Sequence, residues 1–186
     1  MDGDSELVAR VLRGEPAAFL LLVRQYQALV YHVVSGVVRD RDASEDVCQD
    51  TFIKVHGNLA SWSGAGSLKS WIARIAHTTA LNHLRSSKRR KDQESLEQFE
   101  DASGELMFAA PEQVELSVVD EDEARRLRRM VAQLPAPYRE VVQLHYLQEM
   151  SVAEVAAVTG QAEGTVKSNL FRARKRLAEM MERAHG

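Results

Sequence analysis

The sequence predicts an all-α protein built from two small helical domains. Apolar residues recur at three- and four-residue steps on both sides of a central segment, and no stretch alternates apolar and polar residues as a half-buried strand would. The central segment, residues 92–120, loses this periodicity and gains carboxylates, which is typical of a flexible acidic linker. We therefore expect domains at residues 1–91 and 121–186, joined by that linker.

Three helices are expected in the first domain. Each is expected to begin where a residue that favours a helix N-terminus precedes apolar residues at helical spacing. Pro16 suits a first turn because its fixed φ is already helical and its missing N–H would have had no partner there. Residues 58–66, rich in glycine and serine, break the pattern between the second helix and the third. The expected starts are Pro16, Ala43 or Ser44, and Ser67.

Four helices are expected in the second domain, and the last two form a helix-turn-helix. Ser151 and Glu154 have the spacing of a capping box, in which each side chain bonds the other residue's backbone N–H. Gly160 closes that helix because a residue without a Cβ adopts the left-handed conformation freely. The expected ranges are 121–133, 137–147, 151–158 and 163–183.

The last of these helices has an apolar face and a cationic face. Val166, Leu170 and Ala173 recur at helical spacing and are expected to face the core. A helix that enters the DNA major groove needs hydrogen-bonding groups for base edges and Lys or Arg for phosphates on its outer face. The alternative to DNA binding is that the cationic face is simply exposed to solvent. The side chains expected to point outward are Ser168, Phe171, Arg172 and Lys175.

The net charge of −3 conceals a strong separation of charge along the chain. Residues 66–91 carry +7, residues 92–123 carry −12 and residues 124–186 carry +5. Clustered charge sets the local field that a phosphate backbone feels, so the two cationic blocks favour nucleic-acid binding. We also expect the acidic segment to fold back across these cationic surfaces in the free protein.

Two tryptophans stand at the head of the cationic helix in the first domain. Aromatic rings beside Lys and Arg suit unpaired bases, because stacking accepts any base while the cations follow the phosphates. Trp71, flanked by isoleucines, is expected in the core, whereas Trp62 in a polar loop is the better base platform. His77 and His83 lack the spacing of a metal site and are expected as polar surface residues near DNA.

Several classes of function are excluded or disfavoured by composition. No apolar run approaches the ~20 residues of a membrane span, and the N-terminus does not resemble a signal peptide, so a cytoplasmic protein without membrane insertion is expected. Cys48 is the lone cysteine, which excludes an intrachain disulfide, and it is expected to be a small apolar filler. No converging metal ligands and no nucleophile with its base are recognisable. We expect no catalytic residue, no metal and no cofactor.

The order of these motifs resembles the extracytoplasmic-function (ECF) sigma factors of the sigma-70 family. The stretch ASEDVCQDTF at residues 43–52 is similar to the family's polymerase-binding helix, and SLKSWIARIA at residues 67–76 is similar to its promoter-melting helix. Residues 134–177 resemble its domain for the −35 promoter element. The resemblance extends over residues 5–91 and 121–180.

The resemblance implies a subunit that binds core RNA polymerase, through its β′ coiled coil and β flap, and directs it to promoter DNA. It also implies an anti-sigma factor, often linked to the membrane, and a linker that threads toward the polymerase active site. The implied β′ contacts are Asp46, Gln49 and Asp50. The implied contacts with the −10 element and its separated strand are Trp62, Lys69, Arg74, His77, Thr78, Arg85, Lys88, Arg89 and Arg90. The implied contacts with the −35 duplex are Thr165, Lys167, Ser168, Asn169, Phe171, Arg172 and Lys175.

Two other classes of protein remain open at this point. One is a self-sufficient helix-turn-helix regulator, for which residues 121–186 would suffice, but the tryptophans and the cationic helix of the first domain argue against it. The other is a nucleic-acid enzyme such as a nuclease, which would need converging metal ligands or a nucleophile and base.

Overall fold

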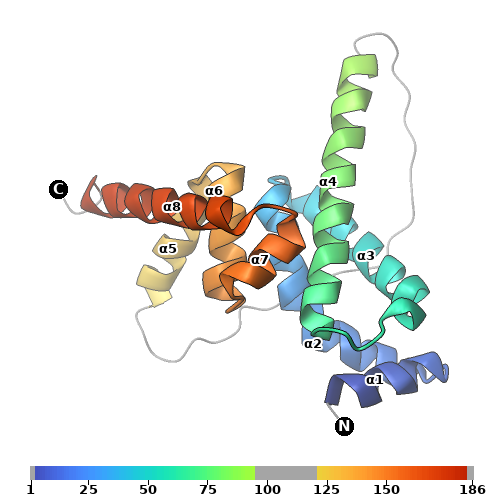
Figure 1. Cartoon of the computed structure of the whole chain (residues 1–186). Coiled ribbons are helices and arrows are strands. Elements are labelled where there is room, and N and C mark those ends of the chain that lie inside the picture. The colour runs from blue at the N-terminus through green and yellow to red at the C-terminus, as the bar shows by residue number, and fades with distance from the viewer. Residues whose placement is uncertain (1–2, 95–120, 184–186) are drawn as a thin grey trace. The chain divides into compact units, whose positions relative to one another are not determined.

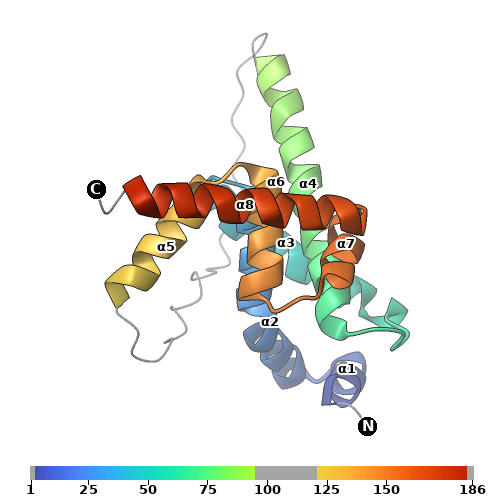
Figure 2. The ribbon, with the colours of Figure 1, turned by 60° about the vertical axis from the view of Figure 1, so that its left-hand side comes forward.

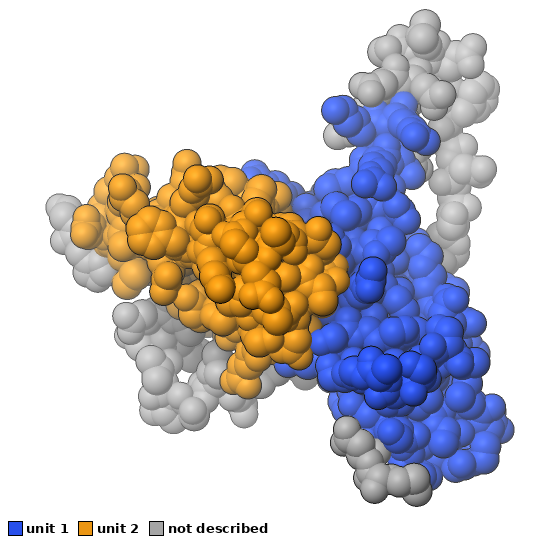
Figure 3. Space-filling view, in the orientation of Figure 1, with its two compact units in different colours: residues 1–110 blue, residues 111–186 orange. Residues whose placement is uncertain are grey.

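The computed structural model describes residues 3–94 and 121–183, which form two compact units with Met1–Ala110 in the first and Pro111–Gly186 in the second (Figures 1 and 3). Every regular element in the described ranges is helical, so the predicted all-α class is confirmed. Most of the predicted linker, residues 95–120, lies outside the described residues.

The first unit is a bundle around a central apolar helix. Helices α2, α3 and α4 pack against one another, and α1 packs on α2. By length and composition α2 is apolar enough to cross a membrane. Its side chains at Leu22, Val30 and Val34 are fully buried in the bundle and form part of the core. The elements are α1 (Gly3–Leu12), α2 (Pro16–Val37), α3 (Arg41–Asn58), the 3₁₀ turn η1 (Leu59–Ser61) and α4 (Leu68–Glu94).

The structure corrects two helix boundaries in this unit and adds one helix, α1. α3 begins earlier than predicted because the Asp40 side chain accepts a hydrogen bond from the backbone N–H of Ala43 at 2.8 Å, which makes Asp40 the N-cap. α4 continues to Glu94, past the predicted domain end at residue 91, and its C-terminal half stands clear of the other helices of this unit in Figures 1 and 2. α1 was not predicted as a separate helix.

The second unit packs three shorter segments against one long helix. Helices α5, α6 and α7 all contact α8, which crosses them in Figure 2. The predicted helix at 137–147 is split, since α6 passes into one π-helical turn. The elements are α5 (Glu121–Gln133), α6 (Ala136–Val142), the π turn η2 (Gln143–Leu147), α7 (Val152–Thr159) and α8 (Glu163–Arg183).

A buried arginine joins α5 to α6. Arg139 is only 2% exposed, and its Nη1 donates hydrogen bonds to the carbonyl oxygens of Leu134 at 3.1 Å and Ala132 at 3.5 Å. The last carbonyls of a helix have no partner within the helix, and the helix dipole favours a cation beside them. Arg139 therefore closes the C-terminal end of α5.

The helix-turn-helix has the predicted caps. The Ser151 hydroxyl accepts from the N–H of Glu154 at 3.2 Å, and the Glu154 carboxylate accepts from the N–H of Ser151 at 2.9 Å. Gly160 ends α7 with φ +70°, in the left-handed region. Both sequence predictions for this motif are confirmed.

Gly160 and Gly164 should respond oppositely to alanine. Gly160→Ala should lower the free energy of unfolding by about 1–2 kcal/mol because a Cβ is strained at φ +70°. Gly164 lies in the first turn of α8 without a positive φ and with nothing within 4 Å of an added Cβ, so Gly164→Ala should raise stability by up to about 1 kcal/mol. Thermal unfolding followed by circular dichroism measures both. Equal effects of the two substitutions would contradict the assigned turn.

Candidate polymerase and DNA interfaces

One side of α3 presents acidic groups together with an exposed apolar side chain. Asp46, Gln49, Asp50 and Ile53 follow one another at i, i+3, i+4 and i+7, which aligns them along one stripe of the helix. The two aspartates are exposed and Gln49 is half-buried. Ile53 is 69% exposed, more than any other large hydrophobic side chain in the described residues. We call these four residues the α3 face.

The other side of α3 packs into the bundle. Val47, Phe52 and Val55 are buried there. Cys48 is buried as well, and burial, assisted by the negative charge of Glu45, raises the pKa of its thiol to about 12. The prediction that Cys48 is an apolar filler is therefore confirmed.

An open groove of about 370 Å³ lies between α3 and α4. Its apolar part is formed by Trp71 and Ile75, and its polar part offers amide, hydroxyl and cationic groups. On the α3 side, the Lys54 ammonium donates to the Thr79 hydroxyl at 3.4 Å. We call this the α3–α4 groove. Its lining is Lys54, Asn58, Trp71, Arg74, Ile75, Thr78, Thr79 and Asn82.

This combination of groups matches the chemistry of an unpaired nucleotide. An indole ring can stack on a base, side-chain amides can pair with base edges, and a cation can hold the adjoining phosphate. Arg74 and Thr78, both predicted as DNA contacts, line the groove. Lys54, Asn58 and Asn82 were missed because no sequence pattern shows which residues of α3 and α4 face each other.

The structure corrects two expectations about α4. Trp71 was expected in the core, but it is half-buried and lines the groove, while Trp62 in the loop is also half-buried. His77 was expected on the surface, and that is wrong, because it is only 4% exposed. The reason is helical period, since Ala73, His77 and Ala80 recur on the buried side of the helix.

The cationic side chains of α4 form a track along the helix. Arg74, Arg85, Lys88 and Arg89 are exposed, Thr78 is exposed beside them, and Lys69 is half-buried. His83 is half-buried and shares a hydrogen bond of 3.3 Å with the Ser87 hydroxyl. The side chain of Arg90 lies outside the described residues. The cationic track and the α3–α4 groove therefore lie in the same unit, the first.

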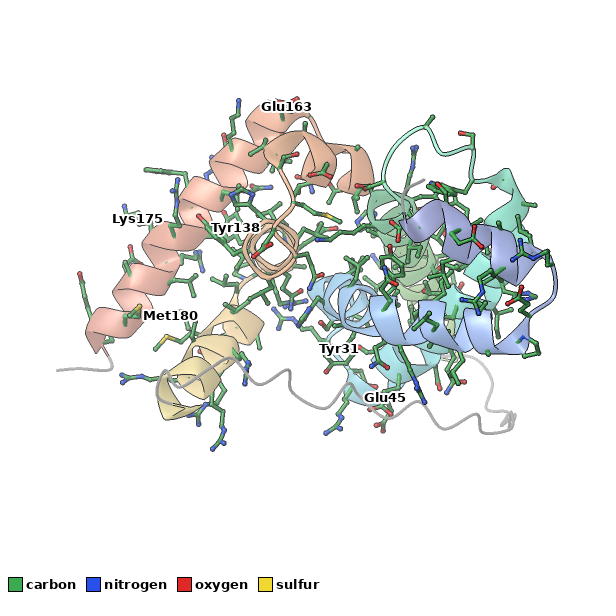
Figure 4. The ribbon with its side chains drawn as sticks, turned by 90° about the horizontal axis from the view of Figure 1, so that it is seen from below. Tyr31, Glu45, Tyr138, Glu163, Lys175 and Met180 are labelled. Carbon is green, nitrogen blue, oxygen red and sulfur yellow. The ribbon has the colours of Figure 1, made fainter. Side chains whose placement is uncertain are left out.

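The apolar and outward faces that the sequence predicts for α8 agree with the burial of its side chains in the structure. Val166, Leu170 and Ala173 are buried, and Phe171 is 64% exposed. Its exposed ring is available for apolar contact with the methyl group of a thymine. Figure 4 shows the Lys175 side chain directed away from α8. The predicted contacts found exposed are Thr165, Lys167, Ser168, Phe171, Arg172 and Lys175.

Asn169 departs from its predicted place on the outward face. It is 8% exposed, and its Nδ2 donates to the Gln161 side-chain oxygen at 3.2 Å. The side chain follows Val166 by three residues and so turns toward the core. Asn169 therefore ties α8 to the turn before it, and a base contact from this side chain is not proposed.

The described residues contain no group of three or more His, Cys, Asp or Glu side chains able to hold a metal ion. The candidate surfaces are instead exposed faces and one open groove.

Comparisons with known proteins identify both units. Residues 22–90 match the family model "Sigma-70 region 2", and residues 124–177 match "Sigma-70, region 4". The chain is 34% identical to the RNA polymerase sigma-H factor of Pseudomonas aeruginosa over 184 residues, covering 96% of this chain and 94% of the relative. It is 36% identical to the ECF RNA polymerase sigma-E factor of Escherichia coli over 178 residues, covering 92% and 91%.

Solved structures show the same fold. CnrH, determined in complex with the cytosolic domain of CnrY, has 23% identity and a TM-score of 0.64, with 97% of this chain and 98% of that chain covered. The sigma factor RpoE of Bartonella quintana, determined with the anti-sigma factor NepR, has 24% identity and a TM-score of 0.64, with 93% and 98% covered. From these matches, the chain belongs to the sigma-70 family and is an RNA polymerase sigma factor of the ECF type.

Proposed function

We propose that this protein is a cytoplasmic, non-catalytic initiation factor that divides its work among three surfaces. The α3 face binds the β′ coiled coil of core polymerase. The α3–α4 groove and the cationic track of α4 hold the −10 element after its strands separate. The outward face of α8 binds the −35 duplex. The observation that carries the proposal is the groove, because only unpaired DNA offers a base to its aromatic and amide groups.

The α3 face supports the first assignment. Interfaces between proteins concentrate their binding energy in a few side chains that become desolvated at the centre. Ile53 is an apolar side chain of this kind, with the carboxylates of Asp46 and Asp50 beside it to select a cationic partner. Ile53 was not among the predicted contacts, although its i+7 spacing from Asp46 signals the same stripe.

An anti-sigma factor is the second proposed partner. A sigma factor of this fold, RpoE of Bartonella quintana, was solved with the anti-sigma factor NepR. An anti-sigma factor that covers the α3 face would exclude polymerase from it.

The β flap of polymerase is the proposed partner of the second unit.

Transcription from a promoter library tests the proposal as a whole. Purified protein added to core RNA polymerase should produce transcripts with new start sites preceded by shared −10 and −35 sequences. Specific DNA binding without polymerase, and no new transcript with it, would instead indicate a self-sufficient regulator.

The double substitution Asp46→Ala with Asp50→Ala should weaken binding to core polymerase about 10- to 100-fold. The reason is that both carboxylates lie on the α3 face, where loss of a central contact costs about 1–3 kcal/mol. Titration with labelled core polymerase measures the affinity. Asp42→Ala is the control, since Asp42 is an exposed acid in the first turn of the same helix. An equal loss from Asp42→Ala would show a general charge effect.

Arg172→Ala should reduce the affinity for −35 duplex DNA about tenfold, because each specific Arg contact with a base or phosphate contributes about 1–3 kcal/mol. Arg174 is the matched control. It is exposed on α8 two residues away and so points to a different side of the helix. Fluorescence anisotropy of the holoenzyme with fork or duplex probes measures both variants. If Arg174→Ala has the larger effect, the assigned DNA face is wrong.

A further inference from the structure

The second unit carries a groove that none of the proposed contacts uses. It has a volume of about 510 Å³ and lies between α5 and α8, away from the turn of the helix-turn-helix. Its lining is Arg126, Arg129, Met130, Gln133, Met180 and Arg183. We call it the Arg–Met groove.

The lining combines an apolar floor with a cationic rim. Met130 is 8% exposed and Met180 is half-buried, so their thioethers form a surface that accepts side chains of many shapes. Figure 4 labels Met180 on α8, close to α5. Arg129 and Arg183 are exposed at the rim, one from each helix. No acidic side chain lines the groove among the described residues.

Helical spacing shows that the α5 side of the groove is one continuous face. Arg126, Arg129, Met130 and Gln133 follow one another at i, i+3, i+4 and i+7. Guanidinium groups bind carboxylates bidentately. An acidic peptide with large apolar side chains therefore has the chemistry that this groove selects.

We propose that the Arg–Met groove docks the chain's own acidic segment, residues 95–120. This segment has seven carboxylates and no basic residue. Its apolar side chains include Phe99 and the run Leu106, Met107 and Phe108. Charge and apolar content both complement the groove.

The position of the segment in the chain favours this occupant over any other. The segment runs directly into α5, so its effective concentration at the groove is in the millimolar range for a short tether. From Phe108 to the start of α5 an extended chain reaches about 40 Å, and α5 is about 20 Å long. Every part of the groove is within reach.

The location of the groove sets the consequence of docking. Met180 lies about 18 Å along α8 from Ser168, so a docked segment leaves the N-terminal turns of α8, where Thr165 and Ser168 lie, uncovered. This differs from the expectation that the segment folds across the DNA-binding surfaces. A protein that binds the groove must displace the segment and thereby release it.

Photo-crosslinking in the full-length protein tests the docking. p-Benzoylphenylalanine in place of Phe108 reacts readily with methionine, so monomeric crosslinked protein should contain links to Met130 or Met180, located by mass spectrometry. Crosslinks only to the first unit, or only between two copies of the chain, would overturn the proposal. So would the absence of any crosslink.

Matched charge reversals separate docking in the groove from general attraction. Arg129→Glu with Arg183→Glu should reduce the crosslink yield about tenfold, because like charges then face each other. Arg125→Glu with Arg128→Glu also reverses two charges, on exposed residues of α5 outside the groove lining, and should leave the yield within about twofold. Equal losses in the two proteins would refute the groove as the docking site. These readouts need neither polymerase nor promoter, so they fail or succeed independently of the proposed promoter contacts.

Discussion

Trp71→Ala should slow promoter opening about 10- to 100-fold while leaving closed-complex formation nearly unchanged. Stacking of a base on an aromatic ring contributes about 1–3 kcal/mol, and only the separated strand offers a base to the α3–α4 groove. Permanganate reactivity of unpaired thymines measures opening, and a gel shift measures the closed complex. Trp71→Phe keeps an aromatic face and should restore most of the rate.

Trp62→Ala provides the comparison that decides between the two tryptophans. Sequence patterning favoured Trp62 as the base platform, and the groove favours Trp71. Asn82→Ala removes one amide from the same groove and should slow opening by a smaller factor. If promoter opening is normal with Trp71→Ala and defective with Trp62→Ala, the base stacks on Trp62 in the loop and not on Trp71.

Arg139→Ala should lower the free energy of unfolding of the second unit by about 3 kcal/mol. The substitution removes a buried cation, leaves the carbonyls of Ala132 and Leu134 without that donor, and opens a cavity under α6. Arg139→Met keeps much of the volume and isolates the hydrogen-bond contribution, for which about half of the loss is expected.

The two units can be followed separately in this experiment. Both tryptophans of the chain, Trp62 and Trp71, belong to the first unit. Denaturation followed by tryptophan fluorescence should therefore be unchanged in Arg139→Ala, whereas far-ultraviolet circular dichroism should show an earlier transition. A shift of the fluorescence transition as well would show that the units unfold together, and an unshifted dichroism transition would show that Arg139 contributes little.

The fold was predictable where local signals act alone. The capping box at Ser151, the left-handed Gly160 and the proline at the start of α2 depend on contacts within one or two turns, and each lies where the sequence places it. α3 starts earlier than predicted because Asp40 and Ser44 are both residue types that favour an N-cap, and it is Asp40 that caps the helix. The π turn that ends α6 within the predicted helix 137–147 has no simple sequence signal.

The candidate site was predictable only in part, because exposure depends on packing between helices. His77 and Asn169 look like surface residues by polarity alone, yet helical period turns both toward a core. Trp71 looks like a core residue by its apolar neighbours, yet α3 leaves one side of its ring in an open groove. Lys54 and Asn82 line that groove from different helices, which only the tertiary fold reveals.

The burial of Cys48 gives the first unit a built-in reporter of its own opening. With a thiol pKa of about 12, almost no reactive thiolate exists in the folded protein at neutral pH. A thiol reagent therefore modifies mainly those molecules in which α3 has transiently separated from the bundle, and the rate of modification measures how often that separation occurs. Because Cys48 and the α3 face share one helix, a protein bound to that face should slow the modification without touching the sulfur. The native sequence can thus report occupancy of the α3 face without an added label.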